Sequence, residues 1–177
     1  TPGTAGRSRS RHVLGRIDST RREDAFGWYV AAIGDLDGDG KRDVVIGAPY
    51  TDRGTGAVTI ASSTVARLRE LHGELPDSHF GEIVAGLDDV DGDGVPDVAI
   101  GAPGSPSATA TRGDVLIVSG KTFAILHRLA QAQPGELYGR QLALLDDLDG
   151  DGVRELAIGA PWAAQGALTR VGRVEVR

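Results

Sequence analysis

Three clusters of carboxylates and glycines have the residue types and spacing of a metal site. In each cluster, acidic side chains occupy loop positions one, three, five and nine, and a glycine occupies position six. So many like charges repel one another, and a multivalent cation makes their proximity favourable. Calcium fits best, because it takes about six to eight oxygen ligands, including a backbone carbonyl at position seven, where the side chain is free to vary. The predicted ligands of about three calcium ions per chain are Asp35, Asp37, Asp39, Lys41 and Asp43; Asp89, Asp91, Asp93, Val95 and Asp97; and Asp147, Asp149, Asp151, Val153 and Glu155.

The residues after each loop distinguish this site from an EF-hand. An EF-hand loop ends in a bidentate Glu at position twelve and lies between two helices, whereas position twelve here is Ile46, Ile100 and Ile158. The surrounding runs are short, apolar and mostly β-branched, which is typical of buried strands. We therefore predict calcium loops inside β-hairpins, closed by the carboxylate at position nine. The alternative is that these stretches are merely turns, in which Asp and Gly are common; three copies with every ligand position filled argue against it.

The strands that must hold these loops also repeat. Residues 26–49 recur at 80–103 and at 138–161, and the opening aromatic residues lie 54 and then 58 residues apart. Each copy runs from an aromatic-glycine pair through an apolar run and the loop to a second apolar run that ends in Gly-Ala-Pro. A fixed period of this length predicts one supersecondary unit per repeat.

The complete pattern, Phe-Gly, then Asp-x-Asp-Gly-Asp-Gly-x-x-Asp, then Gly-Ala-Pro, resembles the FG-GAP repeat of the integrin α-subunit propeller. This resemblance implies an all-β propeller of four-stranded antiparallel blades, with calcium between the first and second strands. It also implies an extracellular binding module. The third copy departs from the pattern with Tyr138 in place of Phe and Glu155 in place of Asp, and we expect the longer Glu to alter the affinity of that site without abolishing it.

The remaining strands follow by analogy between the repeats. Third strands are predicted at 57–60, 115–118 and 174–176, and outer, fourth strands at 12–17, 66–71 and 123–129. The chain is thus predicted to be one propeller unit over 1–177. It comprises an N-terminal segment with an outer strand (1–25) and repeats at 26–79, 80–137 and 138–177, the last lacking its outer strand. Three blades are too few to close a ring. We expect either two chains that exchange the N-terminal strand in a homo-oligomer, or a fragment of a longer propeller of about seven blades.

Charge and composition restrict the partners and the location. Fourteen of the 25 acidic residues lie in or beside the three loops, so three calcium ions would offset the formal charge of −6. The acidity therefore belongs to the metal sites, and nothing indicates a nucleic-acid partner. No apolar stretch reaches membrane-spanning length, so membrane insertion is not expected. Loops of this kind fill where calcium is millimolar, which predicts an extracellular or cell-surface location, or the periplasm.

For function, the sequence favours binding over catalysis. Carboxylates committed to a metal are poor general acids or bases, and no Gly-x-Ser-x-Gly elbow is present. We expect structural calcium and a protein or glycan partner, which the resemblance places on the face opposite the calcium loops. An accessory or catalytic segment of a secreted hydrolase or lyase remains the alternative, since fold alone does not decide between them. Arg112-Gly113-Asp114 also matches an adhesive tripeptide, but Gly113 aligns with the glycines that open the other third strands.

Overall fold

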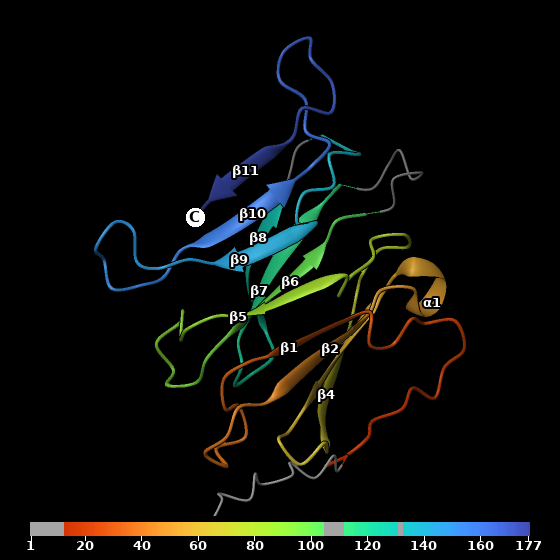
Figure 1. Ribbon diagram of the computed structural model, residues 1–177, viewed down its shortest axis with the longest axis vertical. Coiled ribbons are helices and arrows are strands. Elements are labelled where there is room, and N and C mark those ends of the chain that lie inside the picture. Colours follow the sequence, from red (N-terminus) through yellow and green to blue (C-terminus); the bar gives the residue numbers. More distant parts are fainter. Residues whose placement is uncertain (1–12, 105–111, 131–132) are drawn as a thin grey trace, which may run out of the picture.

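The computed structural model describes residues 13–104, 112–130 and 133–177. Three antiparallel sheets account for the strands of this part of the chain, in the orders β1-β2-β3-β4, β5-β6-β7-β8 and β9-β10-β11 (Figure 1). We call them blades 1, 2 and 3. Their strands are β1 (Tyr29–Ala32), β2 (Val44–Ala48), β3 (Ala57–Ala61) and β4 (Arg67–His72); β5 (Ile83–Gly86), β6 (Val98–Ala102), β7 (Asp114–Val118) and β8 (Ile125–Ala130); and β9 (Gln141–Leu144), β10 (Leu156–Ala160) and β11 (Arg173–Val176).

Burial differs between the strands of a blade as their sequences predict. Strands β3 and β6 are buried at every residue, and they are the apolar runs that lack alternation. Strand β4 instead alternates exposed with partly buried residues along most of its length, because one side faces solvent. Blades 1 and 2 share a core that includes Val45, Ile60 and Ile100, and a second core that includes Ile117 and Ile158 joins blades 2 and 3.

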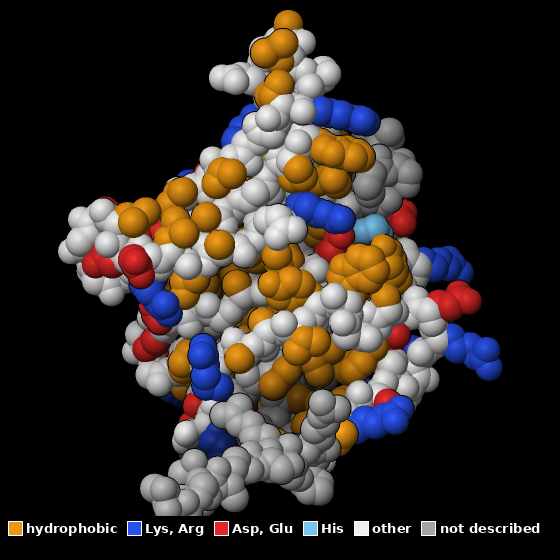
Figure 2. Space-filling view, viewed as in Figure 1, with side chains coloured by type: hydrophobic (Ala, Val, Ile, Leu, Met, Phe, Trp, Pro, Cys, Tyr) orange, Lys and Arg blue, Asp and Glu red, His pale blue; other side chains and the backbone are white. Residues whose placement is uncertain are grey.

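The inner strands of the three blades lie side by side in the middle of the molecule. Strand β5 contacts both β1 and β9, and Figure 1 shows the three strands in succession, with the outer strand β4 of blade 1 toward the bottom of the view. Figure 2 shows hydrophobic side chains gathered over this middle region; Val30 of β1 is among the exposed ones. This is the arrangement of consecutive propeller blades, whose innermost strands surround a common axis.

One local prediction differs from the structure, and one loop contains a feature that was not predicted. The outer strands of blades 1 and 2 form as β4 and β8, but residues 13–18 adopt no regular structure, and Leu14 is fully exposed. A strand needs a neighbour to bond to, and none of the described strands pairs with this segment; His12 falls outside the described residues. The loop after the first Gly-Ala-Pro contains a short helical turn, α1 (Thr51–Gly54), in which Asp52 and Arg53 have left-handed backbone angles.

Candidate calcium sites

The three acidic loops connect the first and second strands of each blade, as predicted. They lie between β1 and β2, between β5 and β6, and between β9 and β10. All three project from the same side of the molecule, on the left of Figure 1, whereas α1 lies on the opposite side. The repeats therefore present their candidate metal sites along one edge.

The aspartate at position one shapes each loop. In the first loop, Asp35 Oδ1 accepts hydrogen bonds from the amides of Gly38 at 2.7 Å and Asp39 at 3.1 Å, and Oδ2 accepts one from Gly40 at 2.7 Å. All three bonds recur in the second loop, and those from positions four and six recur in the third. Gly40 needs its glycine because its φ is +81°. These bonds hold the loop in a tight curl around the carboxylates.

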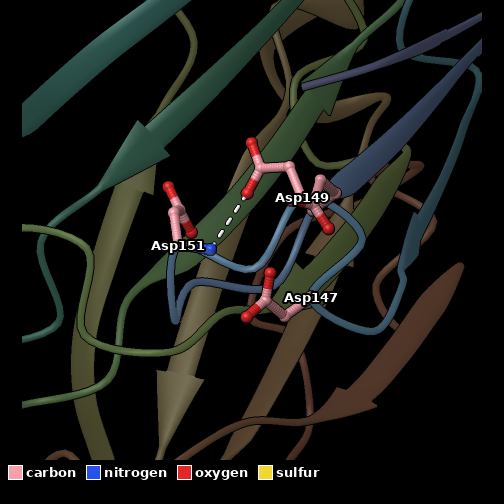
Figure 3. A group of neighbouring side chains, drawn as sticks. Asp147, Asp149 and Asp151 are labelled. Atoms are coloured by element: carbon pink, nitrogen blue, oxygen red, sulfur yellow. Dashed lines mark hydrogen bonds between the residues drawn. The ribbon is translucent and has the colours of Figure 1, made fainter.

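The curl brings most of the predicted carboxylates together. The third loop places a carboxylate oxygen from Asp147, Asp149, Asp151 and Glu155 within 4.8 Å of one another. Figure 3 shows the three aspartates of this group, with the Asp151 amide bonded to Asp149. The corresponding groups are Asp35, Asp37 and Asp39 in the first loop and Asp89, Asp91 and Asp97 in the second; Asp43 and Asp93 lie outside them.

The carboxylate at position nine has a second role in the first two loops. Asp43 and Asp97 are both 0% exposed. Asp43 Oδ2 accepts from the Leu36 amide at 2.8 Å, and Oδ1 accepts from the Ser63 amide at 3.1 Å, in the turn between β3 and β4. Asp97 makes the equivalent pair of bonds. Each aspartate thus ties its calcium loop to the neighbouring turn. Glu155 accepts only the loop bond among the hydrogen bonds described for it, from Leu148 at 2.7 Å.

The pKa values show how the crowded charges are balanced. Hydrogen bonds from backbone amides, that of Gly94 foremost, lower the pKa of Asp89. Desolvation, together with the neighbouring carboxylates, raises the pKa of Asp91. Burial, aided by repulsion from Asp37 and Asp35, also raises the pKa of Asp43. A divalent cation among these oxygens would offset the repulsion, so the donor set fits a hard ion such as calcium.

At position seven the structure explains why the side chain varies. The amides of Lys41, Val95 and Val153 each donate to the position-five carboxylate, at 2.8, 2.9 and 2.8 Å. Their contribution to the loop comes from the backbone, which any residue except proline supplies in the same way.

Ion pairs between the blades are not among the sequence predictions. Arg154 donates from Nε and from a terminal nitrogen to the two oxygens of Asp88, each at 2.7 Å, which lowers the pKa of Asp88. On the side opposite the calcium loops, Arg140 pairs with buried Glu82. The sequence signal for the second pair is that Glu82 and Arg140 follow the aromatic-glycine pair at the same position of successive repeats.

That opposite side also carries an aromatic cluster. Trp28, which is 51% exposed, makes an edge contact with Tyr50, with ring centroids 5.5 Å apart. Tyr50 makes a similar contact with His79 at 5.1 Å.

The Arg112-Gly113-Asp114 tripeptide is engaged within the fold, because Asp114 accepts a hydrogen bond from Arg128 at 2.8 Å.

The repeats match a known family. The model of the FG-GAP repeat matches residues 27–60, 80–118 and 138–174, which contain most of the strands and all three acidic loops. No helix in the described ranges is long and apolar enough to cross a membrane.

Curated relatives point the same way. The chain is 36% identical to human integrin alpha-IIb over 161 residues and 36% identical to Xenopus laevis integrin alpha-4 over 160 residues, each covering 82% of this chain. It is 30% identical to Drosophila melanogaster integrin alpha-PS2 over 151 residues, which cover 79% of the chain. The matches span 15%, 15% and 11% of those proteins. Motif, fold and sequence similarity agree, and the chain belongs to the FG-GAP repeat family, with integrin α-like propeller blades.

Proposed function

We propose that this chain is a calcium-binding, non-catalytic propeller module that binds an extracellular protein or glycan in adhesion. The observation that carries the proposal is the recurrence of one loop geometry three times along one edge of the blades, with carboxylate oxygens within 4.8 Å of one another in each loop. The fifteen residues at positions one, three, five, seven and nine are the proposed ligands of three calcium ions.

Calcium is proposed to act structurally. Each ion would join the end of a first strand to the start of a second and would neutralise carboxylates that otherwise repel. Through Asp43 and Asp97 the first two ions would also stabilise the turn between the third and fourth strands. Because the ion binds the folded loop, its binding free energy adds to the stability of the fold. Such loops fill at millimolar calcium, which supports an extracellular or cell-surface location, or the periplasm.

The partner is proposed to bind opposite the calcium loops. The exposed Trp28 and Tyr50 rings lie there, on the same side as the half-exposed Arg140. Aromatic and arginine side chains are enriched in the energetic centres of protein interfaces, and exposed rings also stack on sugars.

The alternative of a segment from a secreted hydrolase or lyase gains no specific support. Of the loops that follow each Gly-Ala-Pro, where clustered catalytic side chains would favour an enzyme, the first is folded into α1 and its neighbouring turn, and residues 105–111 of the second lie outside the described residues.

A binding assay with two variants tests the proposal. Immobilised extracellular-matrix proteins and a glycan array are probed with the chain in millimolar calcium and again in chelator. Trp28→Ala is expected to reduce binding of the recognised ligand about tenfold or more, the effect of a central aromatic residue, without changing calcium binding. Binding of neither ligand class in calcium, with the chain folded, contradicts the adhesive function.

Asp37→Asn, Asp91→Asn and Asp149→Asn combined remove a ligand charge from each loop while keeping the side-chain acceptor bonded to the position-five amide. This triple variant is expected to bind the ligand as the chelated protein does. Asp18→Asn is the matched control, because it removes an exposed carboxylate that is outside the calcium loops and outside the aromatic cluster. A control that behaves like the triple variant would show that general charge, and not calcium, governs binding.

A further inference from the structure

The acidic loops contain a chemically reactive dipeptide. In an Asp-Gly pair the glycine amide nitrogen can attack the side-chain carboxyl carbon of the aspartate, because glycine has no side chain to hinder the approach. Each loop has one such pair at positions three and four and another at positions five and six. They are all the Asp-Gly pairs of the chain, at 37–38, 39–40, 91–92, 93–94, 149–150 and 151–152.

The reaction rearranges the main chain and needs no other reactant than water. The carboxyl group takes a proton from solvent and loses its hydroxyl as water together with the amide hydrogen, while the new C–N bond closes a five-membered succinimide. Water then adds to one ring carbonyl and breaks its bond to nitrogen. Opening at the side-chain carbonyl restores aspartate, and opening at the main-chain carbonyl gives isoaspartate, in which the main chain runs through the former side chain.

The loop geometry imposes these pairs on the site. All six glycines have φ between 77° and 92°, in the left-handed region that favours glycine. A Cβ built on any of them would meet no atom within 4 Å, so the backbone angle and not a lack of space disfavours a larger residue. The residues before them are proposed calcium ligands. The loop therefore needs glycine and aspartate side by side at both places.

The aspartate at position one holds the attacking nitrogens. Asp35 accepts hydrogen bonds from Gly38 on Oδ1 and from Gly40 on Oδ2, each at 2.7 Å. Asp89 and Asp147 accept the equivalent bonds, at 2.6 to 2.9 Å. An amide that donates to a carboxylate keeps its hydrogen and cannot turn toward the neighbouring carboxyl carbon. One side chain in each loop thus protects two Asp-Gly pairs.

The carboxyl groups that would be attacked are held as well. Oδ1 of Asp37 accepts from the amide of Asp39 at 3.1 Å, and Oδ1 of Asp39 accepts from the amide of Lys41 at 2.8 Å. These bonds join each carboxylate to the second residue along the chain, and they recur in the other two loops, one of them drawn in Figure 3. The six glycines are nevertheless exposed, so water can open a succinimide there.

Isomerisation would destroy the site in which it occurs. Isoaspartate lengthens the main chain by one methylene group and leaves the free carboxylate on Cα. The carboxylate of position three or five would then leave the group of oxygens that the loop gathers, and the following amides would no longer meet the aspartate at position one. The reaction requires the loop to open, because in the closed loop the amide and the carboxyl group are both bonded elsewhere.

We propose that the six Asp-Gly pairs are isomerisation sites, that the aspartates at position one protect them, and that a loop opened by loss of calcium is converted to a form that no longer binds the ion. The calcium sites are thereby lost in proportion to the time that the chain spends without calcium. The protection follows from the hydrogen bonds alone, whereas the dependence on calcium rests on the proposed function.

Ageing the purified chain at neutral pH in calcium, in chelator, and in chelator with urea tests the proposal. Peptide mapping by mass spectrometry, with electron-transfer fragmentation to distinguish isoaspartate from aspartate, gives the rate at each position. The chain contains no asparagine, so every isoaspartate comes from aspartate. The folded chain in chelator is expected to react about tenfold more slowly than in urea, because a bond to a charged acceptor must break. Calcium at ten times its dissociation constant is expected to slow the reaction about tenfold more.

Asp35→Asn tests the protecting residue. The single acceptor oxygen of Asn can take the bonds of Asp35 Oδ1, from Gly38 and Asp39, but its amide group cannot accept from Gly40. In chelator, isoaspartate at Asp39 is expected to form about tenfold faster than in the wild type, the ratio for one lost bond to a charged acceptor. The other two loops of the same molecule are the control, because general unfolding would accelerate all six positions together.

Asp147→Asn and Glu155→Gln form a matched pair in the third loop. Each removes one proposed ligand charge, but only Asp147 accepts the glycine amides; Glu155 accepts from Leu148. In chelator, Asp147→Asn is expected to accelerate isomerisation at Asp149 or Asp151, and Glu155→Gln is expected to leave both rates unchanged.

The outcomes separate the two parts of the proposal. An Asp35→Asn variant that reacts at Asp39 as slowly as the wild type, or equal acceleration by Asp147→Asn and Glu155→Gln, overturns the protection by position one. A wild-type chain that reacts equally fast in calcium and in chelator, while Asp35→Asn still accelerates the reaction, overturns the calcium dependence and with it the calcium sites of the proposed function. Equal rates in chelator with and without urea overturn the proposal as a whole.

Discussion

The first two repeats and the third share one sequence motif but have different neighbours. In the first two, the position-nine aspartate is fully buried and bonded to two amides, one of them in the turn between the third and fourth strands. In the third, Glu155 is only partly buried. The seam glycines Gly47 and Gly101 are pressed against the next blade, whereas Gly159 is not. The difference teaches that the motif specifies the loop and the strands, while the adjacent blade determines how much of the repeat is buried.

Chelation should produce the largest effect on this comparison. Removing calcium is expected to lower the free energy of unfolding by about 4 kcal/mol for each site filled at a thousandfold its dissociation constant. The amides of the two loops with buried aspartates should lose the most protection from hydrogen exchange, because a buried charge without a compensating ion is costly. Thermal unfolding and amide hydrogen exchange, each with and without chelator, measure both effects. Equal loss of protection in all three loops would remove the distinction between the repeats.

A seam substitution should have the next largest effect. Gly47→Ala is expected to destabilise the chain by about 3 kcal/mol, the upper range for overpacking, because its Cβ would lie 1.9 Å from a backbone oxygen. Gly159→Ala is the matched substitution and should cost less than about 1 kcal/mol, since its Cβ would lie 3.2 Å from the Gln141 Cβ and no closer than 3.7 Å to any backbone atom. Denaturant unfolding of both variants at the same protein concentration measures the difference. Equal losses would mean that the seam does not constrain Gly47.

The position-nine carboxylates should differ by a smaller amount. In chelator, Asp97→Asn is expected to cost about 2 kcal/mol, because the amide group cannot accept both backbone hydrogen bonds and leaves a buried donor without a partner. Glu155→Gln should cost less than about 1 kcal/mol, since its environment is more exposed. Urea denaturation of the two metal-free variants compares them. A Glu155→Gln variant that loses as much stability as Asp97→Asn would show that the two carboxylates stabilise their loops equally, and so would contradict the proposed difference.

The smallest effect should be a pH dependence confined to the seam of blades 1 and 2. Burial lowers the pKa of His79 below its usual 6.5 and outweighs the acidic groups nearby, among them Asp77 and the Glu82 carboxylate 3.4 Å away. Below pH 6.5 the unfolded chain therefore binds a proton that the folded chain resists, so stability falls as the pH decreases.

His79→Leu copies Leu137, the equivalent residue of the third repeat, whose φ of 57° is close to the 54° of His79. This variant is expected to flatten the dependence of the melting temperature on pH between about 5 and 7 in chelator. An unchanged slope would place the titrating group elsewhere.

The sequence was sufficient for the features that recur within each repeat. The apolar runs after each loop form β2, β6 and β10, and the glycine-led runs form β3, β7 and β11, because local pattern and turn chemistry determine them. The aspartates at positions one and three gather in all three loops for the same reason.

Features that depend on a neighbour could not be predicted in this way. Asp43 reaches the turn at Ser63, and Arg154 reaches Asp88 in the preceding blade, across 20 and 66 residues of sequence. The strand predicted at 12–17 has the residues of an outer strand but lacks a partner beside it in this structure. In each of these cases the outcome depends on which chain segment packs alongside, and a local pattern does not contain that information.

The central claim is that each loop binds one calcium ion, and counting the bound ions tests it most directly. Isothermal titration of the metal-free chain with calcium is expected to give three ions per chain and strongly reduced binding for the triple variant Asp37→Asn, Asp91→Asn and Asp149→Asn. A folded wild-type chain that binds no calcium at millimolar concentration would contradict the claim, as would a triple variant that binds calcium as well as the wild type does.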